Sequence, residues 1–352
     1  MYETFDDWDN LASTSDLDNG SVGRETVSDA CLLRATTALR TKIRKRENLI
    51  SLERWLRRDI IQNKSEGSIF YKKRIEPASL TLGQYRIGDF HLFNFYSGRS
   101  KGGKLWTSIA MRLNFLRLMT TTVTSVRDLE MVILDLLLRA SGEGEDEEKM
   151  SLQELDKQLH GLEVLALWIA LSKPSVSKRY EKCFEFLNAI ENGDDDANLI
   201  SEQEKSMIRE ALVVSEFGST AMGKRIAVAI MKRINCHVQA QNGGDERLIE
   251  SMADHHLELI LPIKGTKKAW GDAWPDVQER EKWVHRIGNF AIVADKPTAA
   301  EAKMPFSAKK ERYKNEDWPL TAGLAELEEW DSDSLIKHLA NIVNISDKVF
   351  AL

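Results

Sequence analysis

The stretch DHHLELILP, residues 254–262, decides the fold of the C-terminal part of this sequence. Its apolar residues predict a short strand, and Pro262 predicts the end of that strand because proline has no N–H to donate to a sheet. Side chains alternate between the two faces of a strand. We therefore expect Leu257 and Leu259 to point into the core and the carboxylate of Glu258 to point to solvent.

Downstream of this stretch, the sequence predicts a second strand and several helices. HRIGNFAIVA (285–294) is typical of a strand, whereas the apolar residues of FSAKKERY (306–313) have helical spacing. LTAGLAELEEW (320–330) and DSLIKHLANIV (333–343) also predict helices. The Trp-rich segment 267–283 between the two strands is expected to be a loop.

Upstream of the strands, the pattern is mostly helical. Apolar residues recur at helical spacing over 31–62, 107–140 and 151–191, and Pro174 predicts a break in the last of these segments. Segment 66–106 is rich in Gly, Pro and aromatic residues, which predicts loops or short strands.

A capping box and the composition of the chain complete the predicted organisation. Ser201 followed by Glu204 predicts the start of one helix, and 218–238 predicts another. The predicted fold class is mainly α, with helical N-terminal and middle regions followed by a small α+β C-terminal domain. We expect five segments: an acidic disordered tail 1–30, a basic and mostly helical domain 31–140, a linker 141–150, a helical domain 151–245 and a C-terminal domain 246–352.

The net charge of −6 hides an uneven distribution along the chain. Residues 1–30 hold eight acidic residues and one basic residue, whereas residues 31–140 hold 21 Lys and Arg against nine Asp and Glu, a charge of +12. Because phosphate binding depends on local charge, this basic segment is a candidate nucleic-acid surface. Its candidate binding residues are Arg44, Lys45, Arg46, Arg54, Arg57, Arg58, Lys72, Lys73 and Arg74.

Cysteine usage and hydropathy predict a cytoplasmic protein, with a nuclear location as the alternative for a eukaryotic source. The three cysteines, Cys31, Cys183 and Cys236, form no CxxC pair, which argues against a structural zinc site. The acidic N-terminus does not have the pattern of a signal peptide, and no apolar run approaches the length of a membrane span, so we expect no membrane partner.

Five short motifs follow one another in a fixed order in the C-terminal part. They consist of Glu258, Ile260 and Pro262; Trp270 and Trp274; His285, Gly288 and Asn289; Phe306, Lys309 and Tyr313; and Leu320, Thr321 and Trp330. In this order and spacing, residues 254–345 resemble the C-terminal domain of GmrSD-type modification-dependent restriction endonucleases. The nucleotide-dependent domain of that family, with its Asp-Gly-Gln-Gln-Arg motif, is not visible here, so a protein partner could supply it.

The resemblance implies an HNH-like ββα-metal fold and a role with DNA in restriction or anti-phage defence. In such nucleases a strand histidine takes a proton from the attacking water, and one divalent cation stabilises the charge on the phosphate. The catalytic candidates carried over are Glu258, His285 and Asn289, and Glu258 is the candidate metal ligand. Lys309 and Lys310 lie on the helix that would face a phosphate backbone.

The sequence departs from this pattern at the residues that cleavage requires. Leu259 stands where the base histidine is expected and cannot accept a proton. Lys303 and Thr298 stand where asparagines are expected, and an ammonium group would repel a metal ion. His285 and Asn289 would then serve to hold the loop against the strand through hydrogen bonds to the backbone.

Three hypotheses remain from the sequence. The first is a catalytically inactive relative that binds nucleic acid, most readily DNA, without any cofactor. The second is an active endonuclease that holds Mg²⁺ or Mn²⁺ with the relocated residues Glu258, His285 and Asp295. The third is a protein-binding scaffold that does not bind nucleic acid. We rank the first above the third and the third above the second.

Overall fold

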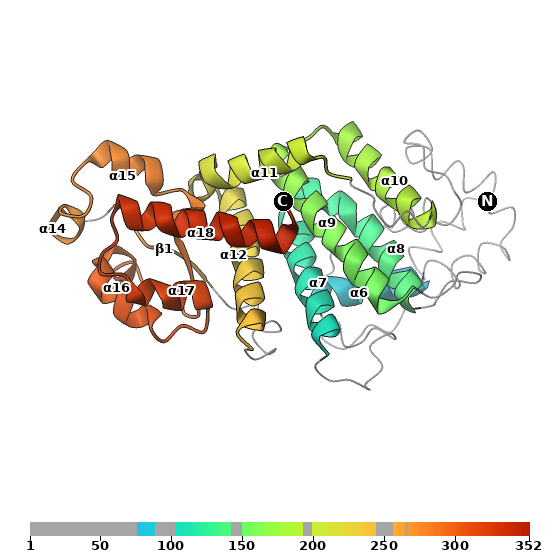
Figure 1. The fold of residues 1–352 in the computed structure, drawn as a ribbon, viewed down its shortest axis with the longest axis horizontal. Coiled ribbons are helices and arrows are strands. Elements are labelled where there is room, and N and C mark those ends of the chain that lie inside the picture. The colour runs from blue at the N-terminus through green and yellow to red at the C-terminus, as the bar shows by residue number, and fades with distance from the viewer. Residues whose placement is uncertain (1–75, 89–102, 142–149, 193–198, 244–255, 265–266) are drawn as a thin grey trace, which may run out of the picture. The chain divides into compact units, whose positions relative to one another are not determined.

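The computed structural model describes residues 76–88, 103–141, 150–192, 199–243, 256–264 and 267–352 (Figure 1). The predicted tail 1–30, the predicted helix 31–62 and most of the predicted linker lie outside the described residues. The chain forms two compact units. The predicted boundaries of the five segments stay predictions.

The first unit contains α6 (Glu76–Ile87), α8 (Glu130–Ser141) and α10 (Val176–Asn192) from Tyr180 onward. Helices α6 and α8 pack against each other. The guanidinium of Arg86 donates two hydrogen bonds, of 3.1 and 2.6 Å, to the carboxylate of Glu130, which is 2% exposed. This bidentate ion pair holds α6 against α8.

Helix α6 corrects the prediction that segment 66–106 contains only loops or short strands. Pro77 lies in the first turn of α6, where its missing N–H has no partner to lose. Gly88 follows the last turn with a φ of 82° and donates its N–H to the carbonyl of Gln84 at 3.1 Å. The same Gly and Pro residues that predicted a loop therefore mark the two ends of a helix.

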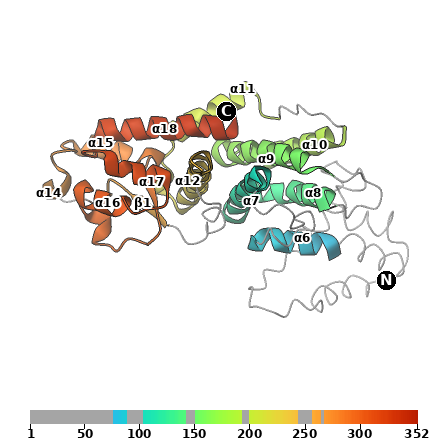
Figure 2. The same cartoon turned by 60° about the horizontal axis from the view of Figure 1, so that its bottom comes forward.

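The second unit contains a layer of helices: α7 (Lys104–Thr122), α9 (Leu152–Ser172), α11 (Glu202–Val214), α12 (Ala221–Gln241) and α18 (Ser332–Phe350). Helix α7 packs against α9 and α12, and α18 runs along α11 and crosses α12 (Figures 1 and 2). The short 3-10 helix η4 (Thr124–Leu129) follows α7, and η5 (Phe217–Ser219) precedes α12.

Local sequence signals set the ends of these helices as predicted. The hydroxyl of Ser201 accepts from the N–H of Glu204, and the Glu204 carboxylate accepts from the N–H of Ser201. This is the predicted capping box at the start of α11. The predicted break at Pro174 is also confirmed, because α9 ends at Ser172 and α10 begins at Val176.

The C-terminal part contains a two-stranded antiparallel sheet. Strand β1 (His256–Leu259) pairs with β2 (Phe290–Val293), and Glu258 lies opposite Ala291. Both strands are shorter than predicted. The fold class is confirmed: the described residues are mainly helical, with this small sheet near the C-terminal end.

Short helices surround the sheet. The segment between the strands carries α14 (Lys267–Trp270), α15 (Val277–Trp283) and η6 (Ile287–Asn289), so the prediction of a plain loop there was wrong. After β2 come η7 (Glu301–Lys303), α16 (Phe306–Tyr313), α17 (Pro319–Gly323) and η8 (Leu324–Glu326). Segment 320–330 is thus helical only in its first part.

A buried ion-pair network joins three helices of the second unit. Glu163 of α9 is fully buried and accepts from Arg112 of α7 at 2.5 Å and from Arg233 of α12 at 2.6 Å. Arg112 also donates to Asp156 at 2.9 Å. Because Glu163 and Arg233 are both removed from water, each depends on the other for its compensation.

Replacement of Glu163 by alanine should destabilise the protein strongly. The change leaves the buried guanidinium of Arg233 without its carboxylate, so the free energy of unfolding should fall by about 3–5 kcal/mol. Urea unfolding followed by circular dichroism measures the loss. The control Asp347→Ala removes the partly exposed pair with Arg209, at 2.9 Å, and should cost less than about 1 kcal/mol. Equal losses in the two variants would contradict the argument.

Candidate functional site

Glu258, the predicted acidic residue of β1, is buried rather than exposed to solvent. It is 2% exposed, whereas Leu257 and Leu259 on either side are only partly buried. The prediction from strand alternation was therefore wrong, because Glu258 is buried and its neighbours Leu257 and Leu259 are the more exposed residues. A buried carboxylate needs compensating partners, and these come from α16.

Helix α16 supplies those partners through its buried face. Phe306, Lys309 and Tyr313 are its buried residues, and their spacing of three and four places them on one side of the helix. The Lys309 ammonium lies 3.0 Å from Oε1 of Glu258 and donates to the backbone carbonyls of Leu259, at 2.7 Å, and Ile260, at 3.0 Å. The ammonium thus donates to two backbone carbonyls and lies within ion-pair distance of the carboxylate.

The second carboxylate oxygen of Glu258 accepts from Arg312, one residue before Tyr313. Burial lowers the pKa of Lys309, and the nearby Glu258 carboxylate opposes that shift. Burial also raises the pKa of Tyr313 well above its usual value, and the carboxylate of Glu258 adds to this effect. Glu258, Lys309 and Arg312, which we call the charge triad, therefore join β1 to α16.

Asn289, the end of the H-x-x-G-N motif, fastens the loop between the strands. Its Oδ1 accepts from the N–H of Leu261 at 2.7 Å and from the indole of Trp330 at 3.2 Å. Its Nδ2 donates to the carbonyls of Leu261, at 2.8 Å, and Val284, at 2.9 Å. The amide thus uses both acceptor positions and both donors, and the predicted hydrogen bonds to the backbone are present.

The rest of the H-x-x-G-N motif serves close packing. The backbone carbonyl of His285 accepts from Gly218 of η5 at 3.0 Å, and the His285 ring packs against this glycine. A Cβ built on Gly288 would lie 2.7 Å from the Cβ of Leu339 in α18. Only glycine lets η6 approach α18 so closely.

The remaining positions of the family pattern lie in different surroundings. Leu259 is partly buried, and its carbonyl is bound to Lys309. Lys303 is exposed at the end of η7, where its carbonyl accepts a long 3.5 Å hydrogen bond from Trp270. Thr298 is exposed and bonds to Glu301 across η7 through its N–H and its hydroxyl.

The side chains at these positions do not fit the divalent cation that the family resemblance implies. Both carboxylate oxygens of Glu258 face cations, and Oδ1 of Asn289 is fully used by N–H donors. Asp295 is exposed. Among the described residues, no group of three His, Cys, Asp or Glu lies close enough together to hold a metal ion. A cation would have to displace an ammonium and a guanidinium from Glu258.

The predicted nucleic-acid residues are distributed unevenly over the structure. The nine candidate residues from Arg44 to Arg74 lie outside the described residues. Lys309 is 1% exposed and directed at the backbone of β1, so its ammonium is not offered to a phosphate. Lys310 is partly buried and donates to the carbonyl of Leu327 at 2.7 Å.

Sequence reasoning missed Arg312 and the burial of Lys309. A signal was present, because Lys309 lies at helical spacing between Phe306 and Tyr313, and a lysine that is fully buried almost always has a charged partner. The only candidate partner on β1 was Glu258.

His338 of α18 also belongs to this region, because its ring packs edge-on against Trp330 at 5.7 Å. Burial lowers the pKa of His338 to about 4, and a hydrogen bond to the backbone of Phe290 acts in the opposite direction. Histidine in an unfolded chain titrates near about pH 6.5. The folded protein therefore holds this imidazole neutral over a range in which the unfolded chain is protonated.

Two paired strands followed by a helix that contacts β1 form a ββα arrangement in the C-terminal part. The comparison with known families agrees: residues 203–345 match the family described as GmrSD restriction endonucleases, C-terminal domain. The match begins at α11, so among the described residues it includes α11 and α12, upstream of the resemblance seen in the sequence. No curated protein matches the chain.

Replacement of Lys309 by methionine should destabilise the domain, because Glu258 then keeps only the more exposed Arg312. We expect a loss of about 3–5 kcal/mol in the free energy of unfolding. The control Lys314→Met removes an exposed pair with Glu311 and should cost less than about 1 kcal/mol. Combining Lys309→Met with Glu258→Gln should cost less than the sum of the single changes. Strict additivity would argue against a coupled triad.

Stability should fall on acidification through His338. Between about pH 6.5 and the folded pKa of about 4, the unfolded chain binds more protons than the folded protein, so stability decreases as pH decreases. The variant His338→Asn should lack this component, which amounts to roughly 2 kcal/mol by about pH 4.5. Urea unfolding at a series of pH values measures it, with His256→Asn as the matched control. If the free energy of unfolding changed with pH in the same way for His338→Asn and for the unchanged protein, the prediction would be contradicted.

Proposed function

We propose that this protein binds DNA and that its GmrSD-type C-terminal region does not cut it. The observation that carries the proposal is the pairing of the Glu258 carboxylate with two cationic side chains. A carboxylate that ligates a catalytic metal needs free lone pairs facing solvent or substrate. Here both oxygens face the cations of α16 inside the protein.

The identity of the neighbouring residues supports the same conclusion. Leu259 offers no imidazole to accept a proton from water, and Lys303 offers no lone pair to a metal. His285 packs on Gly218 and has no described carboxylate partner to form a relocated site. An active endonuclease would require at least two of these side chains to be rearranged.

The DNA-binding part of the proposal rests on the family and on the charge of residues 31–140. A family of restriction endonucleases acts on DNA, and a segment of +12 can neutralise several phosphates. We place this activity in the cytoplasm. No described helix is long and apolar enough to cross a membrane.

The full chain should leave plasmid DNA intact in Mg²⁺ or Mn²⁺. The expected result is no nicking above the level of a Glu258→Gln variant, because the carboxylate is not available to a metal. Gel analysis of supercoiled plasmid over several hours measures the outcome. Divalent-dependent cleavage that disappears in Glu258→Gln would overturn the proposal of an inactive domain.

DNA binding should depend steeply on salt. Each phosphate contact contributes a slope of about 0.9 to the logarithm of affinity against the logarithm of salt concentration. The double change Arg57→Gln and Arg58→Gln should therefore reduce that slope by up to about 1.8. The control is the double change Lys173→Gln and Lys178→Gln, which removes the same charge from two exposed residues. It should leave the slope unaltered. Absence of DNA binding at low salt would favour a protein-binding scaffold instead.

A further inference from the structure

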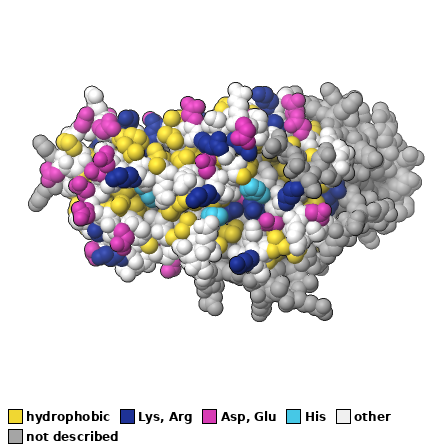
Figure 3. All heavy atoms as spheres, in the orientation of Figure 1, with side chains coloured by type: hydrophobic (Ala, Val, Ile, Leu, Met, Phe, Trp, Pro, Cys, Tyr) yellow, Lys and Arg dark blue, Asp and Glu magenta, His cyan; other side chains and the backbone are white. Residues whose placement is uncertain are grey.

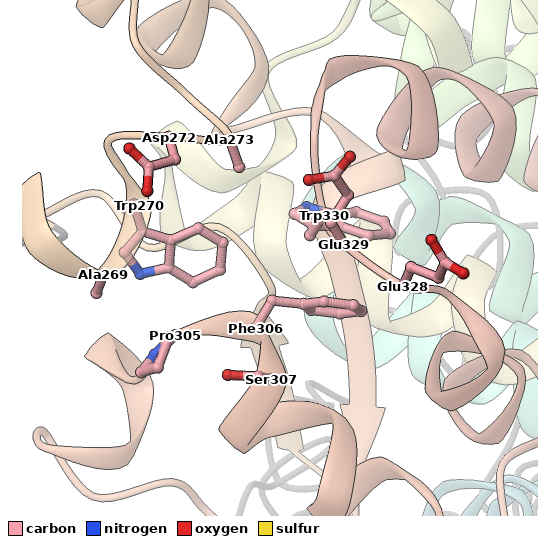
Figure 4. A pocket seen from close by; sticks show the side chains of 10 residues that line it. All are labelled: Ala269, Trp270, Asp272, Ala273, Pro305, Phe306, Ser307, Glu328, Glu329 and Trp330. Atoms are coloured by element: carbon pink, nitrogen blue, oxygen red, sulfur yellow. The ribbon is translucent and has the colours of Figure 1, made fainter.

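A cavity of about 190 Å³ opens between the segment that carries α14 and the start of α16. Figure 4 shows the rings of Trp270, Phe306 and Trp330 around it, and Figure 3 shows acidic side chains gathered over the same end of the second unit. The three residues are at most 6% exposed, so the core covers the faces of their rings. An exposed pair of residues with reactive chemistry lies instead at the end of α12.

Asn242 and Gly243 form an Asn-Gly pair directly after the last turn of α12, at the lower edge of the second unit in Figure 1. Both residues are exposed. Within the described part of the chain, the side-chain amide of Asn242 has no hydrogen-bond partner. Asparagine is one of the thermolabile residue types of proteins, and the residue that follows it controls how readily its side chain reacts.

The reaction is an attack of the backbone on the side chain. The nitrogen of Gly243 attacks Cγ of Asn242, the new C–N bond closes a succinimide ring, and the bond from Cγ to Nδ2 breaks. The proton from the Gly243 nitrogen leaves with the departing ammonia. Water then opens the ring at either of its carbonyls, which gives aspartate or isoaspartate. Water is the only co-reactant.

Gly243 leaves its nitrogen open to this attack. It has no side chain, and a Cβ built on it would meet nothing within 4 Å. Ring closure requires rotation about the Cα–C bond of Asn242 away from its folded ψ of 4°. Among the described residues, that rotation breaks the hydrogen bond from the Gly243 N–H to the carbonyl of Ala240, which is long at 3.4 Å. A weak bond at a helix end opens readily.

Two other asparagines lack this combination of features. Asn344 in α18 is exposed, but it lies inside the helix and is followed by Ile345. The branched side chain of Ile345 crowds the nitrogen, and the helical hydrogen bonds restrain it. Asn289 is buried and its amide is fully bonded. Only Asn242 of these three combines exposure, a free amide and a glycine neighbour.

We propose that Asn242 is a site of spontaneous deamidation, at which the folded protein converts a side-chain amide into aspartate and isoaspartate as it ages. The modification does not depend on whether the protein binds DNA.

The product changes the end of α12. Each event adds one negative charge to the net charge of −6. The new carboxylate lies at the C-terminal end of the helix, where the aligned carbonyls carry partial negative charge and repel it. Isoaspartate also adds a carbon to the main chain. The last turn of α12, in which the Gln241 amide donates to the ring of His237 at 2.9 Å, is therefore weakened.

The test incubates the folded full chain in ¹⁸O-water at mildly alkaline pH and maps its tryptic peptides by mass spectrometry with electron-transfer fragmentation. Digestion in ordinary water separates the events of the incubation from those of the digestion. Peptide 234–247 reports Asn242, and peptide 338–348 reports Asn344. Asn242 should react at least about tenfold faster than Asn344, which corresponds to a barrier lower by about 1.4 kcal/mol or more.

Three variants separate the steps. Asn242→Gln keeps an exposed amide but requires a larger ring, so no isoaspartate should form. Gly243→Ala places a methyl group beside the attacking nitrogen and should slow the reaction several-fold. Asn242→Asp carries the charge of the product and should speed amide hydrogen exchange in the last turn of α12, whereas exchange in α18 should stay unchanged.

Four outcomes would overturn the proposal. If Asn242 stays intact in the folded protein while a synthetic peptide 234–247 deamidates, the fold protects the site. If Asn344 reacts as fast as Asn242, the glycine and the helix end do not matter. An unchanged rate in Gly243→Ala would remove the role of the open nitrogen. Unchanged hydrogen exchange in Asn242→Asp would remove the effect on α12.

Discussion

The contact between Glu258 and Lys309 organises the C-terminal part of this protein. A carboxylate on β1 and an ammonium on α16 are both removed from water, and neither would be tolerated there without the other. The ammonium also donates to the carbonyls of Leu259 and Ile260 at the end of β1. Lys309 and Arg312 together hold α16 against β1, alongside the buried Phe306 and Tyr313 of the same helix.

The contact with Lys309 suits Glu258 to a structural role and leaves it poorly suited to bind a metal. A metal-binding carboxylate must keep its oxygens free, whereas a buried structural carboxylate must have both satisfied. Glu258 cannot meet both requirements in one conformation. The residues at the other family positions show the same division: Asn289 is saturated by backbone groups, and Gly288 serves a close helix contact. The motif therefore remains as a packing pattern around a carboxylate that is turned inward.

Sequence reasoning succeeded where the determining signals are local. The capping box at Ser201, the break at Pro174 and the span of α16 depend on neighbours within a few residues, and all are present. It failed where a distant partner decides. The orientation of Glu258 was mistaken because its partners lie on α16, and no strand periodicity can report them. For α6, the Gly and Pro signals were recognised but assigned to a loop, since burial of Tyr85 is a tertiary property.

The proposed DNA binding and the packing of the C-terminal part use charges in different places. The excess of Lys and Arg that would attract DNA lies in residues 31–140. In the C-terminal part, Lys309 and Lys310 are instead bonded to backbone carbonyls. Under this proposal, DNA binding would depend on a segment other than the one that carries the family motifs.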